Sequence, residues 1–192
     1  MGPGSIIHRL NEKADILDAV AAVSRNGDSQ LSTRQWVAAV QAEAHAGLGN
    51  LSRCQRALDT AGSVLDVSGP ASPGGWLRFD GTRLGEERGT CYLALGRAGL
   101  AESELNSALK VTGSLRRRGS ILTDLATLGV RHKDTSQILH YASDAIDIAA
   151  QTRSAGYLGR KLSALQPQIL PLLADARMAE LNDRINRLHA AT

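Results

Sequence analysis

The feature that most constrains this chain is a Leu-Gly pair followed, twelve residues after the glycine, by an alanine. The pattern occurs at Leu95-Gly96 with Ala108, and at Leu48-Gly49 with Ala61. A glycine at a helix end accepts a left-handed backbone conformation, in which a side chain would clash. An alanine in the next helix lets the two helices approach closely. The pattern predicts a helical hairpin, and one hairpin cannot bury its own apolar face, so the unit has to repeat.

A weaker third copy follows, in which Lys133 stands at the glycine position and Ala145 lies twelve residues later. The three corners at 49, 96 and 133 are then 47 and 37 residues apart. Helix-turn-helix repeats have a period of about 34 residues. The excess in the first spacing is explained by residues 68–75, whose glycines, prolines and serines predict a loop.

This repeat resembles a degenerate tetratricopeptide repeat. Three segments, 36–49, 76–80 with Arg83-Leu84, and 88–97, also resemble the C-terminal repeat regions of actinobacterial helix-turn-helix transcriptional regulators. The resemblance covers roughly residues 30–165. The chain departs from the repeat where an aromatic residue is expected in each second helix, at Leu65, Thr112 and Ala149.

The pattern predicts an all-α fold, a right-handed superhelical array of about four antiparallel helix hairpins with about nine helices. Residues 6–192 would form one tetratricopeptide-like domain, and residues 1–5 resemble a cloning scar left after tag removal. Pro167 and Pro171 are expected to interrupt the fourth hairpin, and Ser32 or Thr33 to cap the helix that ends near Leu48. The expected helices cover residues 8–25, 33–48, 51–67, 76–95, 98–111, 115–131, 135–150, 156–165 and 175–189.

Composition agrees with close helix packing. Alanine, leucine and glycine dominate, while the aromatic residues are only 2 Trp, 3 Tyr and 1 Phe, which argues against a β sandwich. The longest apolar run, 169–174, is short and contains Pro171, so no membrane segment is expected. The cysteines, Cys54 and Cys91, have no metal-site spacing, and we expect reduced core thiols in a cytoplasmic protein; a disulfide between them is the less favoured alternative.

No catalytic pattern stands out. The chain has no phosphate-binding loop and no Gly-x-Ser-x-Gly elbow, and its five histidines are scattered. We therefore expect no enzyme, no metal and no cofactor. The net charge of +3 is mild, and the only dense basic run is Arg116-Arg117-Arg118. This run is interpreted first as a solvated helix start, with contact to a phosphate or an acidic partner as the alternative.

Binding is the more natural role. In tetratricopeptide arrays the first helix of each pair lines a concave surface, which implies a peptide-binding groove here. Arginines in such a groove can hold a carboxylate, and a tryptophan can anchor a partner. The competing interpretations are packing at a helix start for Trp36 and ion pairs with nearby glutamates for Arg83 and Arg97. The expected groove residues are Trp36, Glu43, Asn50, Arg83, Glu86, Thr90, Arg97, Asp124 and Thr127.

The resemblance implies the sensor or interaction part of a bacterial transcriptional regulator, with a peptide or protein segment as its ligand and a homodimer as a possible assembly. Residues 6–30 are too short for a helix-turn-helix module, so we expect no specific DNA binding by this chain alone. The alternative is a stand-alone scaffold or adaptor that self-associates through its last helix or through residues 169–173. A small-molecule sensor is a third hypothesis.

Overall fold

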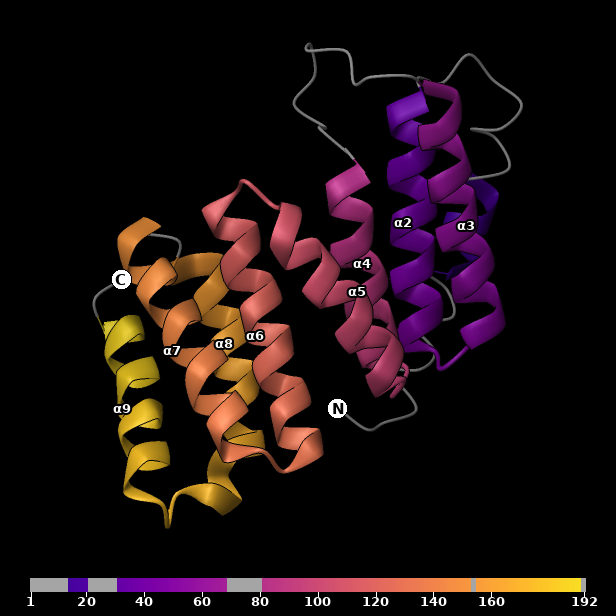
Figure 1. Ribbon diagram of the computed structural model, residues 1–192. Coiled ribbons are helices and arrows are strands. Elements are labelled where there is room, and N and C mark those ends of the chain that lie inside the picture. The colour runs from indigo at the N-terminus through magenta and orange to yellow at the C-terminus, as the bar shows by residue number, and fades with distance from the viewer. Residues whose placement is uncertain (1–13, 21–30, 69–80, 153–154, 191–192) are drawn as a thin grey trace. The chain divides into compact units, whose positions relative to one another are not determined.

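The computed structural model describes residues 14–20, 31–68, 81–152 and 155–190 (Figure 1). Every regular element in these ranges is a helix, which confirms the all-α prediction, and none of these helices combines the length and apolar character needed to cross a bilayer. With the helical residues 14–20, the described ranges hold nine α-helices, as expected. The others are α2 (Leu31–Gly47), α3 (Leu51–Ser68), α4 (Gly81–Ala94), α5 (Ala98–Val111), α6 (Leu115–His132), α7 (Thr135–Thr152), α8 (Ala155–Ile169) and α9 (Ala176–Ala190).

Most helix boundaries agree with the sequence pattern to within two residues, but two expectations were wrong. α2 begins at Leu31, so Ser32 and Thr33 lie inside the helix and do not cap it. α8 continues through Pro167 to Ile169, so Pro167 withholds one N–H from the helical ladder without ending the helix. The interruption comes later, at a 3-10 turn, η1 (Leu170–Leu172), that contains Pro171. Residues 1–5 and Trp76 lie outside the described ranges.

The three predicted corners share one backbone conformation. Gly49 and Gly96 have φ angles of +72° and +71°, and Lys133 has a φ of 58°. Lys133 is the one non-glycine residue with positive φ in the described ranges. At each corner this residue donates its N–H to a carbonyl three residues back, and the next residue donates to a carbonyl five residues back (2.8–3.1 Å). This pairing is the Schellman motif, so the assignment of Lys133 to the missing glycine position is confirmed.

The residues after the corners are also equivalent. The carbonyls of Asn50, Arg97 and Asp134 each accept the first hydrogen bond of the next helix. The side chains of Asn50 and Asp134 accept from the backbone N–H three residues on, at 3.0 and 2.9 Å, which caps α3 and α7. The alanines twelve residues after the corners, Ala61, Ala108 and Ala145, are all buried. One local pattern therefore forms the same corner three times.

The chain divides into two compact units, Met1–Glu104 and Leu105–Thr192, with α5 crossing the boundary. In the first unit α2 packs against α3, and α4 packs against both. Small side chains fill most of this core, which allows the three helices to lie close together. The core residues are Ala38, Ala39, Ala42, Ala46, Cys54, Ala57, Leu58, Ala61, Leu84 and Cys91.

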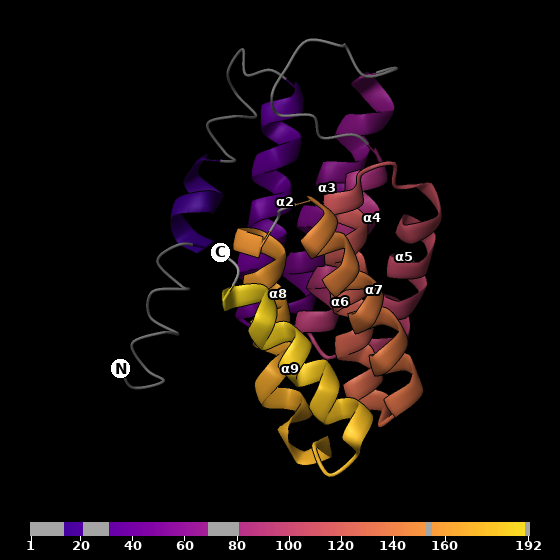
Figure 2. The same ribbon diagram turned by 90° about the vertical axis from the view of Figure 1, so that its left-hand side faces the viewer.

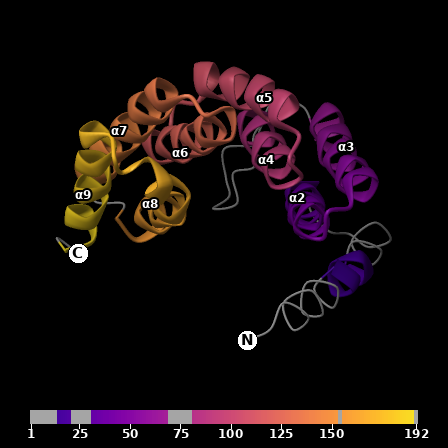
Figure 3. The same ribbon diagram turned by 90° about the horizontal axis from the view of Figure 1, so that it is seen from below.

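The second unit has two layers of helices. Viewed along the helices, α6 and α8 lie side by side in one layer, and α7 and α9 lie in the other (Figure 3). α9 packs on both α7 and α8 (Figure 2), and its apolar residues Met178, Leu181 and Ile185 are buried in this core. The apolar stripe that suggested self-association through the last helix is thus covered by the helix's own unit.

We predict that replacing the corner glycine of the second hairpin, Gly96→Ala, lowers the free energy of unfolding by about 1 kcal/mol. A Cβ added at this position would meet no heavy atom within 4 Å, so the cost comes from the left-handed backbone alone. Conversely, Lys133→Gly should raise the free energy of unfolding by about 0.5–1 kcal/mol. Urea denaturation followed by circular dichroism measures both changes.

Gly99→Ala is the matched control, since Gly99 lies three residues away, on α5, also with open space around its Cβ position but without a positive φ. An alanine there should leave stability unchanged or raise it by up to about 1 kcal/mol. Equal losses from Gly96→Ala and Gly99→Ala would contradict the special role of the corner.

Candidate functional site: the polar surface of α6 and α8

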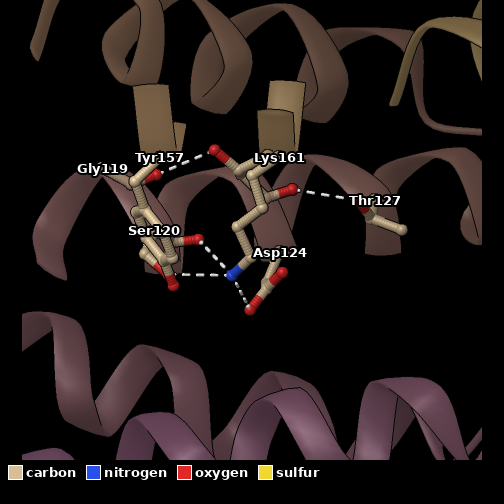
Figure 4. A network of polar contacts seen from close by, with 7 residues as sticks. Gly119, Ser120, Asp124, Thr127, Tyr157 and Lys161 are labelled. Atoms are coloured by element: carbon tan, nitrogen blue, oxygen red, sulfur yellow. Dashed lines mark hydrogen bonds and ion pairs between the residues drawn. The ribbon is translucent and has the colours of Figure 1, made fainter. Parts of the chain in front are cut away.

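A cluster of polar side chains joins α6 to α8 in the second unit (Figure 4). Ser120 and Asp124 lie one turn apart on α6, and Tyr157 and Lys161 lie one turn apart on α8. This spacing of four residues places each pair on one face of its helix. The four residues, together with Arg116, are called here the α6–α8 surface.

Lys161 is the centre of this cluster. Its Nζ donates to Oδ2 of Asp124 at 2.6 Å, to Oγ of Ser120 at 2.8 Å and to the backbone carbonyl of Ser120 at 3.2 Å. The Asp124 side chain is 6% exposed and that of Lys161 is 22% exposed. A carboxylate this deeply buried requires a charged partner, so the pair fixes α8 against α6 while the Lys161 side chain still reaches solvent.

Tyr157 extends the cluster to the outside. Its hydroxyl lies 3.4 Å from Oγ of Ser120, and the residue is 38% exposed. The guanidinium of Arg116 lies over the ring, with Cζ 4.6 Å from the ring centroid. This cation–π contact holds an arginine beside a partly exposed aromatic ring, an arrangement common at binding surfaces.

Two local features of the sequence define the start of α6 and its packing against α8. Ser114 caps α6 by accepting a hydrogen bond from the N–H of Arg117 at 3.4 Å, which fixes the start of the helix. One turn later, Gly119 faces α8, and a Cβ at this position would lie 2.7 Å from Cδ1 of Leu158. Only a glycine fits there without a shift of Leu158.

The surroundings of this surface are cationic. Arg116, Arg117 and Arg118 occupy the first turn of α6, which contains no acidic residue, and Arg160 is exposed next to Lys161 on α8. Positive charge at a helix N-terminus is unfavourable, because the helix dipole is itself positive there. The three arginines therefore destabilise the start of α6, and an anion bound at this surface would offset this effect.

Of the expected groove residues of the third hairpin, Asp124 belongs to this surface and Thr127 lies three residues further along α6. Asp124 is buried and ion-paired with Lys161. Thr127 is half-buried, and its hydroxyl donates to the carbonyl of Thr123 at 3.0 Å. Sequence reasoning missed Tyr157 and Lys161, although their spacing of four residues on α8 matches that of Ser120 and Asp124.

The expected groove residues of the first hairpin are spread along α2 and its corner. Trp36 is 38% exposed and Glu43 is exposed, both on α2. Asn50, in contrast, lies beyond the helix and caps α3.

The expected groove residues of the second hairpin have different environments. Nε of Arg83 donates to Oε1 of Glu87 at 3.2 Å, which is the ion pair that competed with a binding role for Arg83. Glu86 is buried, and Thr90 is half-buried. Arg97 is exposed directly after the corner.

A further polar cluster ties the helical residues 14–20 to the first hairpin. Oδ1 of Asp18 accepts a hydrogen bond from Nε2 of Gln41 at 2.6 Å and lies 3.5 Å from Nε2 of His45. Oδ2 of Asp18 lies 3.8 Å from Arg53. In the residues described, no three His, Cys, Asp or Glu side chains meet as a metal site requires.

Comparison of the chain with protein-family models, with curated proteins and with solved structures found no match.

We predict that Lys161→Met lowers the free energy of unfolding by about 3 kcal/mol, because the substitution leaves the Asp124 carboxylate buried without its cation. The double substitution Asp124→Leu with Lys161→Met should recover most of this loss, since it removes both charges. Denaturant unfolding of the single and double variants measures the coupling between the two residues.

Arg184→Met provides the control. Arg184 pairs with Asp147 at 2.7 Å, but the Asp147 side chain is 72% exposed. Loss of this ion pair should lower the free energy of unfolding by about 1 kcal/mol or less. If Lys161→Met cost no more than Arg184→Met, the account of Asp124 as a buried, paired carboxylate would be wrong.

Proposed function

We propose that this chain is a protein- or peptide-binding domain of the tetratricopeptide-like type. Three hairpins with the same left-handed corner and the same buried alanine support a repeat architecture. The proposal includes a right-handed superhelix of about four hairpins, in which α2, α4, α6 and α8, the first helices of the pairs, line a concave surface.

The observation that carries the proposal is the α6–α8 surface, where an arginine and a lysine flank a partly exposed tyrosine. The apolar ring offers contact area, and the adjacent guanidinium offers paired donors for a carboxylate. We therefore infer that the ligand is an acidic, extended polypeptide segment. Its carboxylates would interact with Arg116 and Arg160, and its apolar side chains would pack on Tyr157.

We further propose that the domain serves as the sensor or interaction part of a bacterial transcriptional regulator, as the resemblance of residues 30–165 implies. Ligand binding would then favour one curvature or dimer arrangement of the array and so bias an attached DNA-binding domain. On this proposal the chain alone does not bind DNA specifically, and its effect on DNA is indirect.

We predict that a short fluorescent peptide rich in Asp and Glu binds the full chain, and that Arg116→Glu weakens this binding about tenfold or more. A tenfold loss is about 1.4 kcal/mol, the scale of one charge-assisted hydrogen bond. Tyr157→Ala should weaken binding by a similar factor. Fluorescence anisotropy titration measures each dissociation constant, and affinity should fall as ionic strength rises from about 0.05 to 0.5 M.

Arg187→Glu makes the same change of charge at an exposed position of α9, in the other layer of the unit. At physiological ionic strength it should leave the affinity within about twofold, because salt weakens the interaction between exposed charges that are not in contact. Equal losses from Arg116→Glu and Arg187→Glu would mean that the peptide responds only to net charge. Equal affinity for a basic peptide of the same length would reject an acidic ligand.

A further inference from the structure

The two cysteines of the chain lie together in the core of the first unit. Cys54 on α3 is 0% exposed and Cys91 on α4 is 1% exposed, and both belong to the same cluster of buried residues. Both are free thiols. The pair has no part in the proposed peptide site, which lies in the second unit.

The register of α3 against α4 explains why Cys54 and Cys91 lie close together. A Cβ at Gly62 would lie 3.5 Å from Leu84, and Asp59 lies 3.7 Å from the guanidinium of Arg88. Each step back along α3 is thus matched by a step forward along α4, as in an antiparallel pair. Continuing in the same sense brings Cys54 opposite Cys91.

The two thiols differ because they hydrogen bond with each other. The Cys91 S–H donates to the sulfur of Cys54, which lowers the pKa of Cys54 below its ordinary value. The same hydrogen bond raises the pKa of Cys91, and burial and the negative charges of Glu43 and Glu87 raise it further. Cys54 is therefore the thiol that ionises first, and Cys91 is the neighbour that keeps its proton.

We propose that Cys54 and Cys91 form a redox modification site, a buried thiol pair that hydrogen peroxide converts reversibly into an intramolecular disulfide linking α3 to α4. Peroxide is close to water in size, so it suits a site that excludes bulky reagents. Disulfides in reducing compartments are typically transient or sensory, which matches a pair that is free in the resting protein.

The chemistry balances in two steps. Cys54 loses its proton, and its thiolate attacks one oxygen of peroxide; the O–O bond breaks, a Cys54 sulfenic acid forms, and the departing hydroxide takes up a proton to give water. The sulfur of Cys91 then attacks the Cys54 sulfur. The S–S bond forms, the S–O bond breaks, and the hydroxyl leaves with the Cys91 proton as a second water. Both sulfurs are oxidised, and peroxide is reduced to two waters.

Formation of the disulfide brings two sulfurs that hydrogen bond with each other to a separation of about 2.05 Å. The cross-link would close the loop of residues 54–91 and fix the first hairpin to the first helix of the second. We expect oxidation to raise the melting temperature by about 5 °C or more, because closing a loop of this length restricts the unfolded chain.

The test is oxidation of the full chain with hydrogen peroxide, followed by mass spectrometry of the intact protein and of its peptides. The expected product has lost two hydrogen atoms, has no titratable thiol under denaturing conditions, and contains a linked pair of peptides that carry Cys54 and Cys91. Dithiothreitol should restore both thiols. In Cys91→Ser, the serine hydroxyl replaces the donor to Cys54, and unfolding the peroxide-treated variant in denaturant that contains dimedone should trap a sulfenic acid on Cys54.

The control is a chain with Cys54→Ser, Cys91→Ser and Ser52→Cys, which carries one thiol at an exposed position of α3. The proposal is overturned if both native thiols survive a peroxide dose that fully oxidises the introduced thiol of this control. It is also overturned if the wild-type product is a cross-linked dimer, or if each cysteine is oxidised separately to a sulfinic or sulfonic acid. A lower melting temperature of the disulfide form would reject the stabilising link between the helices.

Discussion

The left-handed residue at each helix corner is the constraint on which the rest of the structure depends. Gly49, Gly96 and Lys133 end three helices in the same conformation, and each is followed by a helix that turns back on the first. This geometry brings Ala61, Ala108 and Ala145 into buried positions. Lys133 shows that the conformation is demanded by the fold, since a non-glycine residue adopts it at a cost of about 1–2 kcal/mol. The third corner is thus held by its surroundings more than by its own sequence.

The two units have largely apolar cores, and each core contains a different kind of polar contact. In the second unit a buried carboxylate and a partly exposed lysine join α6 to α8, and the same contact positions an arginine over a tyrosine at the surface. In the first unit the core contains a buried pair of thiols. An ion pair at the edge of a core fixes the orientation of the groups beside it, which suits a binding surface. Two neighbouring thiols, in contrast, can be oxidised.

The fold was largely predictable because its main signal is local. A corner glycine and the alanine twelve residues later lie within one hairpin, so the sequence pattern locates both, including the lysine that replaces the third glycine. The candidate site was less predictable because it depends on contacts between residues about 40 positions apart, such as Ser120 with Lys161. The expectation that the first helix of each pair lines a groove identified Asp124, but this residue is buried because α8 packs on α6. The hydrogen bond between Asp18 and Gln41 of α2 could not be predicted for the same reason, since the two residues belong to different helices.

The central claim, that three hairpins are copies of one structural unit, is tested most directly by the alanines. The measurement is the change in the free energy of unfolding when Ala61, Ala108 and Ala145 are replaced one at a time by leucine. Each alanine is at most 3% exposed, so the three substitutions should lower the free energy of unfolding by similar amounts, about 1–3 kcal/mol each, because leucine overpacks each buried position. A large loss at one alanine with no loss at the other two would contradict the equivalence of the hairpins.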